Sequence, residues 1–167
     1  FESHPPIRVL ADIEAIEAVP LERAIDAWTT YDLIALSARD FSDKPAFHFL
    51  RAGTADEAPL TLTYDALGRR MVQAANTFHR LGIERGDVIA YLLPNLPETI
   101  YALLGGTVAG AVAPINWMLE PEQIAALLNA TRARVLVVLG PTPGFQIWDK
   151  VAALRERVPS LEHVLQV

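Results

Sequence analysis

Residues 88–139 read VIAYLLPNLPETIYALLGGTVAGAVAPINWMLEPEQIAALLNATRARVLVVL, and this stretch decides the fold class. Short β-branched and aliphatic runs without a polar face recur here and downstream, at Val88 to Leu93, Ala111 to Ile115, Val135 to Leu139 and His163 to Val167. Such runs fit strands that are buried on both faces, as in parallel sheets. Helical segments lie between them, at Pro97 to Ala109, Pro121 to Thr131 and Phe145 to Val158. The alternation predicts an α/β fold with a parallel βαβ-type sheet flanked by helices.

Helix signals support this division. Asn95 stands three residues before Glu98 and predicts a side-chain cap for the helix that begins at Pro97. Upstream, Thr63 can cap a further helix that stops at Gly82. The buried face of that helix is given by three-and-four spacing of Leu67, Met71, Ala74, Ala75, Phe78 and Leu81.

The first part of the chain carries weaker signals. Thr29 to Asp32 predicts a cap before a helix that reaches about Asp40. Ala46 to Leu50 and Leu60 to Thr63 predict the two strands of a hairpin. Residues 11–28 have an acidic character, which fits either a solvated helix face or an arm lying over the next segment. We therefore divide the chain into an N-terminal arm, residues 1–28, and an α/β subdomain, residues 29–167.

Composition narrows the classes of function. Fourteen Lys and Arg against 20 Asp and Glu give a net charge of −6, which disfavours a nucleic-acid surface. The absence of Cys excludes disulfides and thiolate sites and suits a cytoplasmic location. The uncharged run from Thr99 to Leu119 contains glycines and Pro114, so it predicts a buried helix and strand and no transmembrane segment. The sequence begins at Phe1 without a signal-peptide pattern, so either an initiator Met is missing or the numbering begins inside a longer chain.

The common catalytic and metal motifs are missing from the sequence. It contains no Gly-x-Ser-x-Gly elbow, no His-Glu-x-x-His and no Walker-type phosphate loop. The segment most similar to a phosphate loop is Gly105 to Gly110, but its glycines fall inside a predicted helix. This position favours a role in which the glycines let the helix pack closely against the sheet. The histidines stand singly, without the spacing that places two imidazoles on one helix face, so we expect no metal site.

Topology points to one location for a ligand. In open parallel sheets, ligands meet the carboxyl ends of the strands, which here lead into Pro94 to Leu96, Asn116 to Leu119 and Gly140 to Gly144. Asn116, Trp117 and Met118 place an aromatic ring and a thioether where they could cover an adenine or a pantetheine, or where the Trp could cap the core edge. Gly144 ends a stiff turn. The amides of this turn could face an anion, or the turn could simply connect the strand to the next helix.

Six segments in this order resemble the start of the AMP-forming adenylate synthetases, and among them the acyl-CoA synthetases. They are Leu62 to Leu67, Leu81 to Ala90, Leu93 to Glu98, Ala109 to Asn116, Glu120 to Ile124 and Ala133 to Val137. The resemblance is close over residues 28–140 and weaker elsewhere. It implies that the fold is part of the large N-terminal domain of an adenylate-forming enzyme.

The resemblance also implies an activity for a longer parent protein. Such enzymes use ATP and magnesium to convert a carboxylic acid, here a fatty or related acid, to an acyl-adenylate, and then transfer the acyl group to coenzyme A. The family's phosphate loop, adenylate motif, ribose-binding Asp and catalytic Lys have no counterpart in residues 1–167. We therefore expect a fragment that ends before the phosphate loop, is inactive alone, carries no catalytic or metal-binding residue, binds no cofactor by itself and has the remainder of its own chain as partner.

Two site loops follow from the same resemblance. In some relatives, the loop that matches Asn116, Trp117 and Met118 and the loop near Gly144 approach the nucleotide part of coenzyme A. Trp117 and Met118 depart from the small or Pro residues that are commoner there. Glu120 replaces the usual Ser or Thr before Pro121, which implies a helix cap weaker by about 1 kcal/mol.

Other functions stay open at this point. A parent of the same family could load a carrier protein or make only the adenylate. A third hypothesis is a self-contained flavodoxin-like module that binds a nucleotide or an interaction partner.

Overall fold

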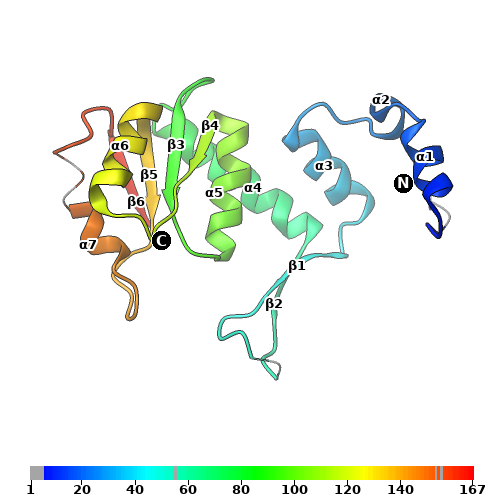
Figure 1. The fold of residues 1–167 in the computed structure, drawn as a ribbon, viewed down its shortest axis with the longest axis horizontal. Helices are drawn as coiled ribbons and strands as arrows, with labels where there is room; N and C mark the ends of the chain where they lie inside the picture. The colour runs from blue at the N-terminus through cyan, green and yellow to red at the C-terminus, as the bar shows by residue number, and fades with distance from the viewer. Residues whose placement is uncertain (1–5, 55, 153, 155) are drawn as a thin grey trace.

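The computed structural model describes residues 6–54, 56–152, 154 and 156–167, and its centre is a parallel sheet. The strands are β3 (Val88–Leu92), β4 (Ala111–Pro114), β5 (Ala133–Val138) and β6 (His163–Gln166). They lie in the order β4-β3-β5-β6, with every neighbouring pair parallel (Figure 1). The predicted α/β class with a parallel sheet is confirmed.

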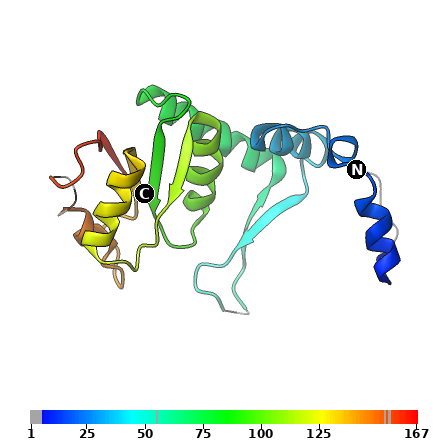
Figure 2. The same ribbon diagram turned by 45° about the horizontal axis from the view of Figure 1, so that its top comes forward.

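Helices cover both faces of this sheet. α5 (Pro97–Ala109) and α4 (Tyr64–Arg80) lie on one side, whereas α6 (Pro121–Thr131) and α7 (Ile147–Ala152) lie on the other (Figures 1 and 2). Fully buried aliphatic side chains fill the space between the layers, among them Ile89, Leu128 and Leu136. Such a two-sided cover explains why the strands carry no polar face.

The uncharged run from Thr99 to Leu119 divides into most of α5, the strand β4 and the loop that follows, as predicted. Among the described residues, none of the helices combines the length and the apolar character needed to cross a bilayer.

The last predicted helix is wrong in extent. The sequence predicts Phe145 to Val158, but α7 covers only Ile147–Ala152. Gly144 has φ +84°, and the Phe145 amide donates to the Thr142 carbonyl at 3.1 Å, so this part of the chain forms a turn before the helix begins. Residues 153 and 155 of the predicted helix lie outside the described residues.

The predicted capping residue of α5, Asn95, is also wrong. The N-cap position belongs to Leu96, and Asn95 lies one residue earlier. Thr99 fixes this helix start instead, because its Oγ1 accepts from the Leu96 amide at 3.3 Å and donates to the Pro94 carbonyl at 2.6 Å. Glu120 makes no side-chain cap for α6, and Gln123 Oε1 accepts from the Glu120 amide at 3.1 Å.

Glycines let α5 approach its neighbours on two sides. A Cβ on Gly106 would stand 2.5 Å from Val112 Cγ2, so that glycine faces the sheet, as predicted. A Cβ on Gly105 would stand 2.4 Å from Ala74 Cβ, so that glycine faces α4 instead. One pair of small residues therefore serves two different contacts.

The amino-terminal part extends away from the sheet. α3 (Thr30–Asp40) packs against α4, and β1 (Pro45–Phe49) and β2 (Leu60–Thr63) form the predicted antiparallel hairpin. α1 (Leu10–Glu17) and α2 (Leu21–Ala24) lie at the end of the molecule farthest from the parallel sheet (Figures 1 and 2). α1 buries none of its residues, which fits a solvated helix. Residues 1–5 of the predicted arm lie outside the described residues, and the division at residue 28 stays a prediction.

Candidate functional site

A cavity of about 430 Å³ lies beside the loops that follow β4 and β5. Its lining consists of Trp117, Met118, Gly144, Phe145, Gln146, Ile147 and Lys150. Three predicted site residues, Trp117, Met118 and Gly144, are thus brought together although they lie on separate loops. The fourth, Asn116, is not part of the lining. Its Oδ1 accepts a hydrogen bond from the Met118 amide at 3.0 Å and so shapes the loop.

Two aromatic rings form one wall of this cavity. The centroids of Trp117 and Phe145 are 5.5 Å apart, with an interplanar angle of 63°, which is an edge-to-face contact. Trp117 also packs against the hydrophobic core, so it caps the core edge and lines the cavity at once. Met118 is 64% exposed and stands free to contact a ligand.

Lys150 connects this loop to α7. Its Nζ donates to the Trp117 carbonyl at 3.1 Å and to the Leu119 carbonyl at 2.8 Å. The side chain is half-buried. A charged donor that reaches two carbonyls holds the loop more firmly than a neutral donor would.

The turn after β5 uses some of its own amides. The Gly140 amide donates to the Val167 carbonyl at 3.1 Å, and the Phe145 amide closes the turn on Thr142. Pro141 and Pro143 have no amide to offer. These bonds favour the connector interpretation of the segment over the anion-binding one.

The chemistry of the lining suits an adenine nucleotide. Aromatic faces and a thioether can contact a base, and Lys150 is the charged side chain in the lining, which holds no carboxylate. A phosphate group would therefore meet a positive charge without a competing negative one. The cavity also stands at the carboxyl end of a parallel sheet, where ligands of such folds bind.

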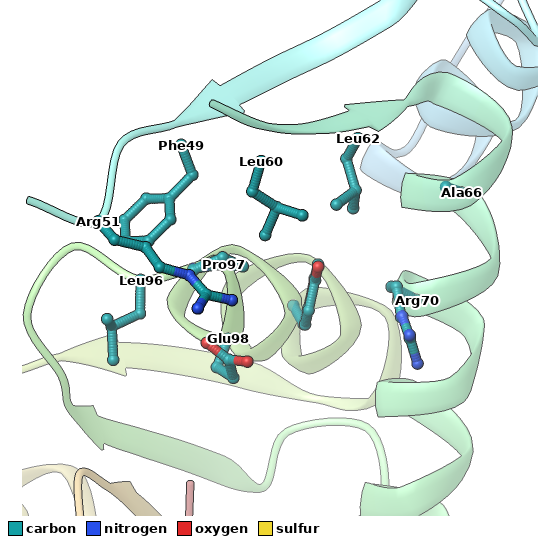
Figure 3. A pocket seen from close by; sticks show the side chains of 10 residues that line it. Phe49, Arg51, Leu60, Leu62, Ala66, Arg70, Leu96, Pro97 and Glu98 are labelled. Carbon is teal, nitrogen blue, oxygen red and sulfur yellow. The ribbon is translucent and has the colours of Figure 1, made fainter. Parts of the chain in front are cut away.

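A larger cavity of about 740 Å³ separates the hairpin from α4 and α5. Figure 3 shows Leu60 and Leu62 of the hairpin directed toward the helices, and Arg51 directed toward Glu98. Leu96, from the loop after β3, belongs to this cavity and not to the smaller one. Burial raises the pKa of the Tyr101 phenol in this lining. Since Arg51, Arg70 and Glu98 supply both charge signs, the lining favours no single class of ligand.

No cluster of three metal-ligating side chains occurs within residues 6–54, 56–152, 154 and 156–167. The sequence prediction also missed four residues of the smaller cavity, Phe145, Gln146, Ile147 and Lys150. The partners of Phe145 and Lys150 lie about 30 residues away along the chain, so local patterns carry no signal for these contacts.

Comparison with known proteins gives a consistent result. The profile of the family described as AMP-binding enzyme matches residues 34–167. A marinolic acid–CoA ligase of Pseudoalteromonas sp. strain SANK 73390 is 30% identical over 149 residues, which are 89% of this chain and 23% of that protein. A crotonobetaine/carnitine–CoA ligase of Salmonella arizonae is 40% identical over 80 residues, which are 47% of this chain and 16% of that protein. The chain thus spans about a quarter or less of the length of these relatives.

Solved structures share the fold. An anthranilate CoA ligase, AuaEII, solved with anthranoyl-AMP, superposes with a TM-score of 0.72 at 22% identity and covers 90% of this chain and 26% of its own. The N-terminal domain of FACL13 from Mycobacterium tuberculosis gives a TM-score of 0.72 at 18% identity, covering 84% of this chain and 34% of its own. Both similarities concern the arrangement of the described helices and strands.

Proposed function

The chain belongs to the family of AMP-binding enzymes, and from this membership we propose that it is the N-terminal part of an acyl-CoA synthetase. The parent enzyme would join a carboxylic acid to the α-phosphate of ATP with magnesium, releasing pyrophosphate and leaving an acyl-adenylate. The thiol of coenzyme A would then attack the acyl carbon, and AMP would leave. Relatives of this chain are named as CoA ligases and as an acetyl-coenzyme A synthetase, which supports this assignment.

We assign the chemical steps to residues outside this chain. The sequence has no counterpart of the family's ATP-binding motifs, and the described residues hold no metal cluster. Within this proposal, the 167 residues alone are inactive and contribute scaffold and one subsite. The substrate is a fatty or related carboxylic acid, and the absence of Cys supports a cytoplasmic location.

The subsite that we assign to this chain receives the nucleotide end of coenzyme A. The observation that carries it is the cavity formed by Trp117, Met118 and Gly144, which lie on two loops at the carboxyl end of the sheet. Trp117 and Phe145 would contact the adenine, and these two residues would bind and orient the thiol substrate without moving a proton. Lys150, whose Nζ is bonded to two loop carbonyls, would act on the phosphates only through its charge.

The order β4-β3-β5-β6 is also that of flavodoxin-like sheets, so topology alone does not separate this proposal from a self-contained module. The family match favours the enzyme. Whether the acyl group passes to coenzyme A or to a carrier protein is tested by offering both acceptors to the complete enzyme.

The test is ATP–pyrophosphate exchange with a panel of carboxylic acids, comparing the 167-residue chain with the product of the complete reading frame. We expect exchange from the long product alone and thioester formation with coenzyme A. Exchange by the short chain would show that the active site is misplaced in our assignment. If neither the 167-residue chain nor the complete product catalyses exchange, the result would support the binding-module hypothesis.

The subsite has its own test in the complete enzyme. Trp117→Ala should raise the KM for coenzyme A about tenfold, since base–aromatic stacking contributes about 1–3 kcal/mol. Trp28→Ala is the matched control, because Trp28 is 80% exposed and lies outside this cavity. An unchanged KM in Trp117→Ala would place the subsite elsewhere.

A further inference from the structure

We propose that Lys150 is a positioning residue for the coenzyme A subsite, holding the loop from Trp117 to Leu119 in the conformation that forms the cavity wall. The inference rests on the proposed function, since it concerns the subsite assigned above. It adds a residue that no sequence motif indicates.

The loop closes on itself before Lys150 reaches it. Asn116 Oδ1 accepts from the Met118 amide at 3.0 Å, and the Asn116 carbonyl accepts from the Leu119 amide at 3.2 Å. These bonds define a tight turn, but both join residues of the same loop. They do not fix where the turn stands relative to α7.

Lys150 supplies that second restraint. Its Nζ donates to the carbonyls of Trp117 and Leu119, at 3.1 and 2.8 Å, and so grips the loop on both sides of Met118. The two bonds span 33 and 31 residues of sequence. The ammonium group has three donors, so these bonds use two of them.

The same restraint sets the aromatic wall. The carbonyl that Lys150 holds belongs to Trp117, whose ring meets Phe145 at 5.5 Å. Phe145 stands before α7, and Lys150 stands within it. Lys150 therefore keeps Trp117 beside Phe145 in the absence of a ligand, and a preformed wall costs less ordering when coenzyme A binds.

A general structural role predicts a different result from a positioning role. If Lys150 only stabilised the fold, its loss would affect both half-reactions of the enzyme. If it positions the subsite, its loss weakens coenzyme A binding and leaves adenylate formation intact. Pyrophosphate exchange reports adenylate formation and does not need coenzyme A, so the two roles separate.

The experiment uses the complete enzyme and four variants: Lys150→Met, Lys150→Arg, Lys44→Met and Trp117→Ala. Lys44 is the chain's other lysine, and it lies over the Phe41 ring, so Lys44→Met is the matched control. Three quantities are measured: the rate of pyrophosphate exchange, the KM for coenzyme A in thioester formation, and the Kd for coenzyme A by titration calorimetry.

We expect Lys150→Met to raise the KM and the Kd for coenzyme A about five- to tenfold, with exchange unchanged. Lys150→Arg keeps a cationic donor and should recover most of the affinity, and Lys44→Met should match the wild type. The effects of Lys150→Met and Trp117→Ala should combine less than additively, because Lys150 acts through Trp117.

Three results would overturn the role of Lys150. If Trp117→Ala weakens coenzyme A binding and Lys150→Met does not, the subsite stands and Lys150 does not position it. If neither variant changes coenzyme A binding while the wild type forms the thioester, the assigned subsite itself is wrong. If Lys150→Met also loses pyrophosphate exchange, the contact supports the whole fold and not the subsite.

Discussion

Arg134 Nη1 donates a hydrogen bond to Asp87 Oδ2 at a distance of 2.5 Å, which joins the beginning of β5 to the residue just before β3. The same guanidinium donates through Nε and Nη2 to Glu162, at 2.8 and 2.7 Å, just before β6. One side chain thus ties the amino ends of three neighbouring strands. This cluster lies at the opposite edge of the sheet from the candidate cavity.

The cluster predicts a pH dependence of stability. The Glu84 amide and then Arg134 lower the pKa of Asp87, and Arg134 lowers the pKa of Glu162. A carboxyl whose folded pKa lies below its unfolded value stabilises the fold above the unfolded value and loses this effect as the pH falls through the folded one. We expect the denaturation midpoint of the 167-residue chain to fall between about pH 5 and pH 2.

Arg134→Gln isolates the contribution of the cluster. Its midpoint at pH 7 should be lower than that of the wild type, and its decrease toward acid pH should be smaller. Arg157→Gln is the control, because Arg157 pairs with Glu122 in a more exposed position. Parallel pH profiles for the wild type and Arg134→Gln, measured by urea denaturation, would contradict this account.

Gly105 and Gly68 predict opposite effects of the same substitution. Gly105→Ala places a Cβ 2.4 Å from Ala74 Cβ and 2.8 Å from the Ala75 amide nitrogen, so it should lower the free energy of unfolding by about 1–3 kcal/mol. Gly68→Ala meets only Ala38 Cβ at 3.4 Å and gains helix propensity, so it should stabilise by up to about 1 kcal/mol. Urea denaturation measures both, and equal effects would refute the close approach of α5 to α4.

Two adjacent leucines of α6 test which face of that helix is buried. Leu128 is fully buried and Leu127 is 42% exposed. Leu128→Ala should cost about 2–5 kcal/mol of unfolding free energy, because it leaves a cavity between α6 and the sheet. Leu127→Ala should cost less than about 1 kcal/mol. A larger loss for Leu127→Ala would mean that the helix is rotated from the position described.

Thr99 and Asn95 test the start of α5. Thr99→Val removes both hydrogen bonds of the Thr hydroxyl and should cost about 1 kcal/mol. Asn95→Ala should stay within about 0.5 kcal/mol, since Asn95 is exposed and does not occupy the cap position. The comparison is made by thermal denaturation, and a reversed order would restore the capping role that the sequence pattern predicts for Asn95.

Elements marked by local chemistry could be predicted from the sequence. α5 and α6 begin at Pro97 and Pro121, as predicted, because a Pro in the first turn is a local signal. β5 begins at Ala133, two residues before the predicted start at Val135, and so includes the charged Arg134. The Arg134 guanidinium reaches past the strand ends to Asp87 and Glu162.

The candidate site likewise contains residues that the sequence could predict and residues that it could not. Trp117, Met118 and Gly144 were predicted because they follow strands, and topology places strand ends together. Lys150 and Phe145 act through partners about 30 residues away, and no spacing rule links such positions. The boundary between α7 and the preceding turn depends on the φ of Gly144, which the sequence permits but does not require.

The strand order has a consequence for synthesis. Of the four strands of the parallel sheet, β3 is synthesised first and occupies an inner position. β4 then pairs with one side of β3, β5 pairs with its other side, and β6 pairs with β5 last. Each new strand meets an edge that is already exposed, and none must be inserted between two paired strands. Since amino-terminal units fold first during synthesis, this strand order lets the sheet form outward from β3 without rearrangement of strands that are already paired.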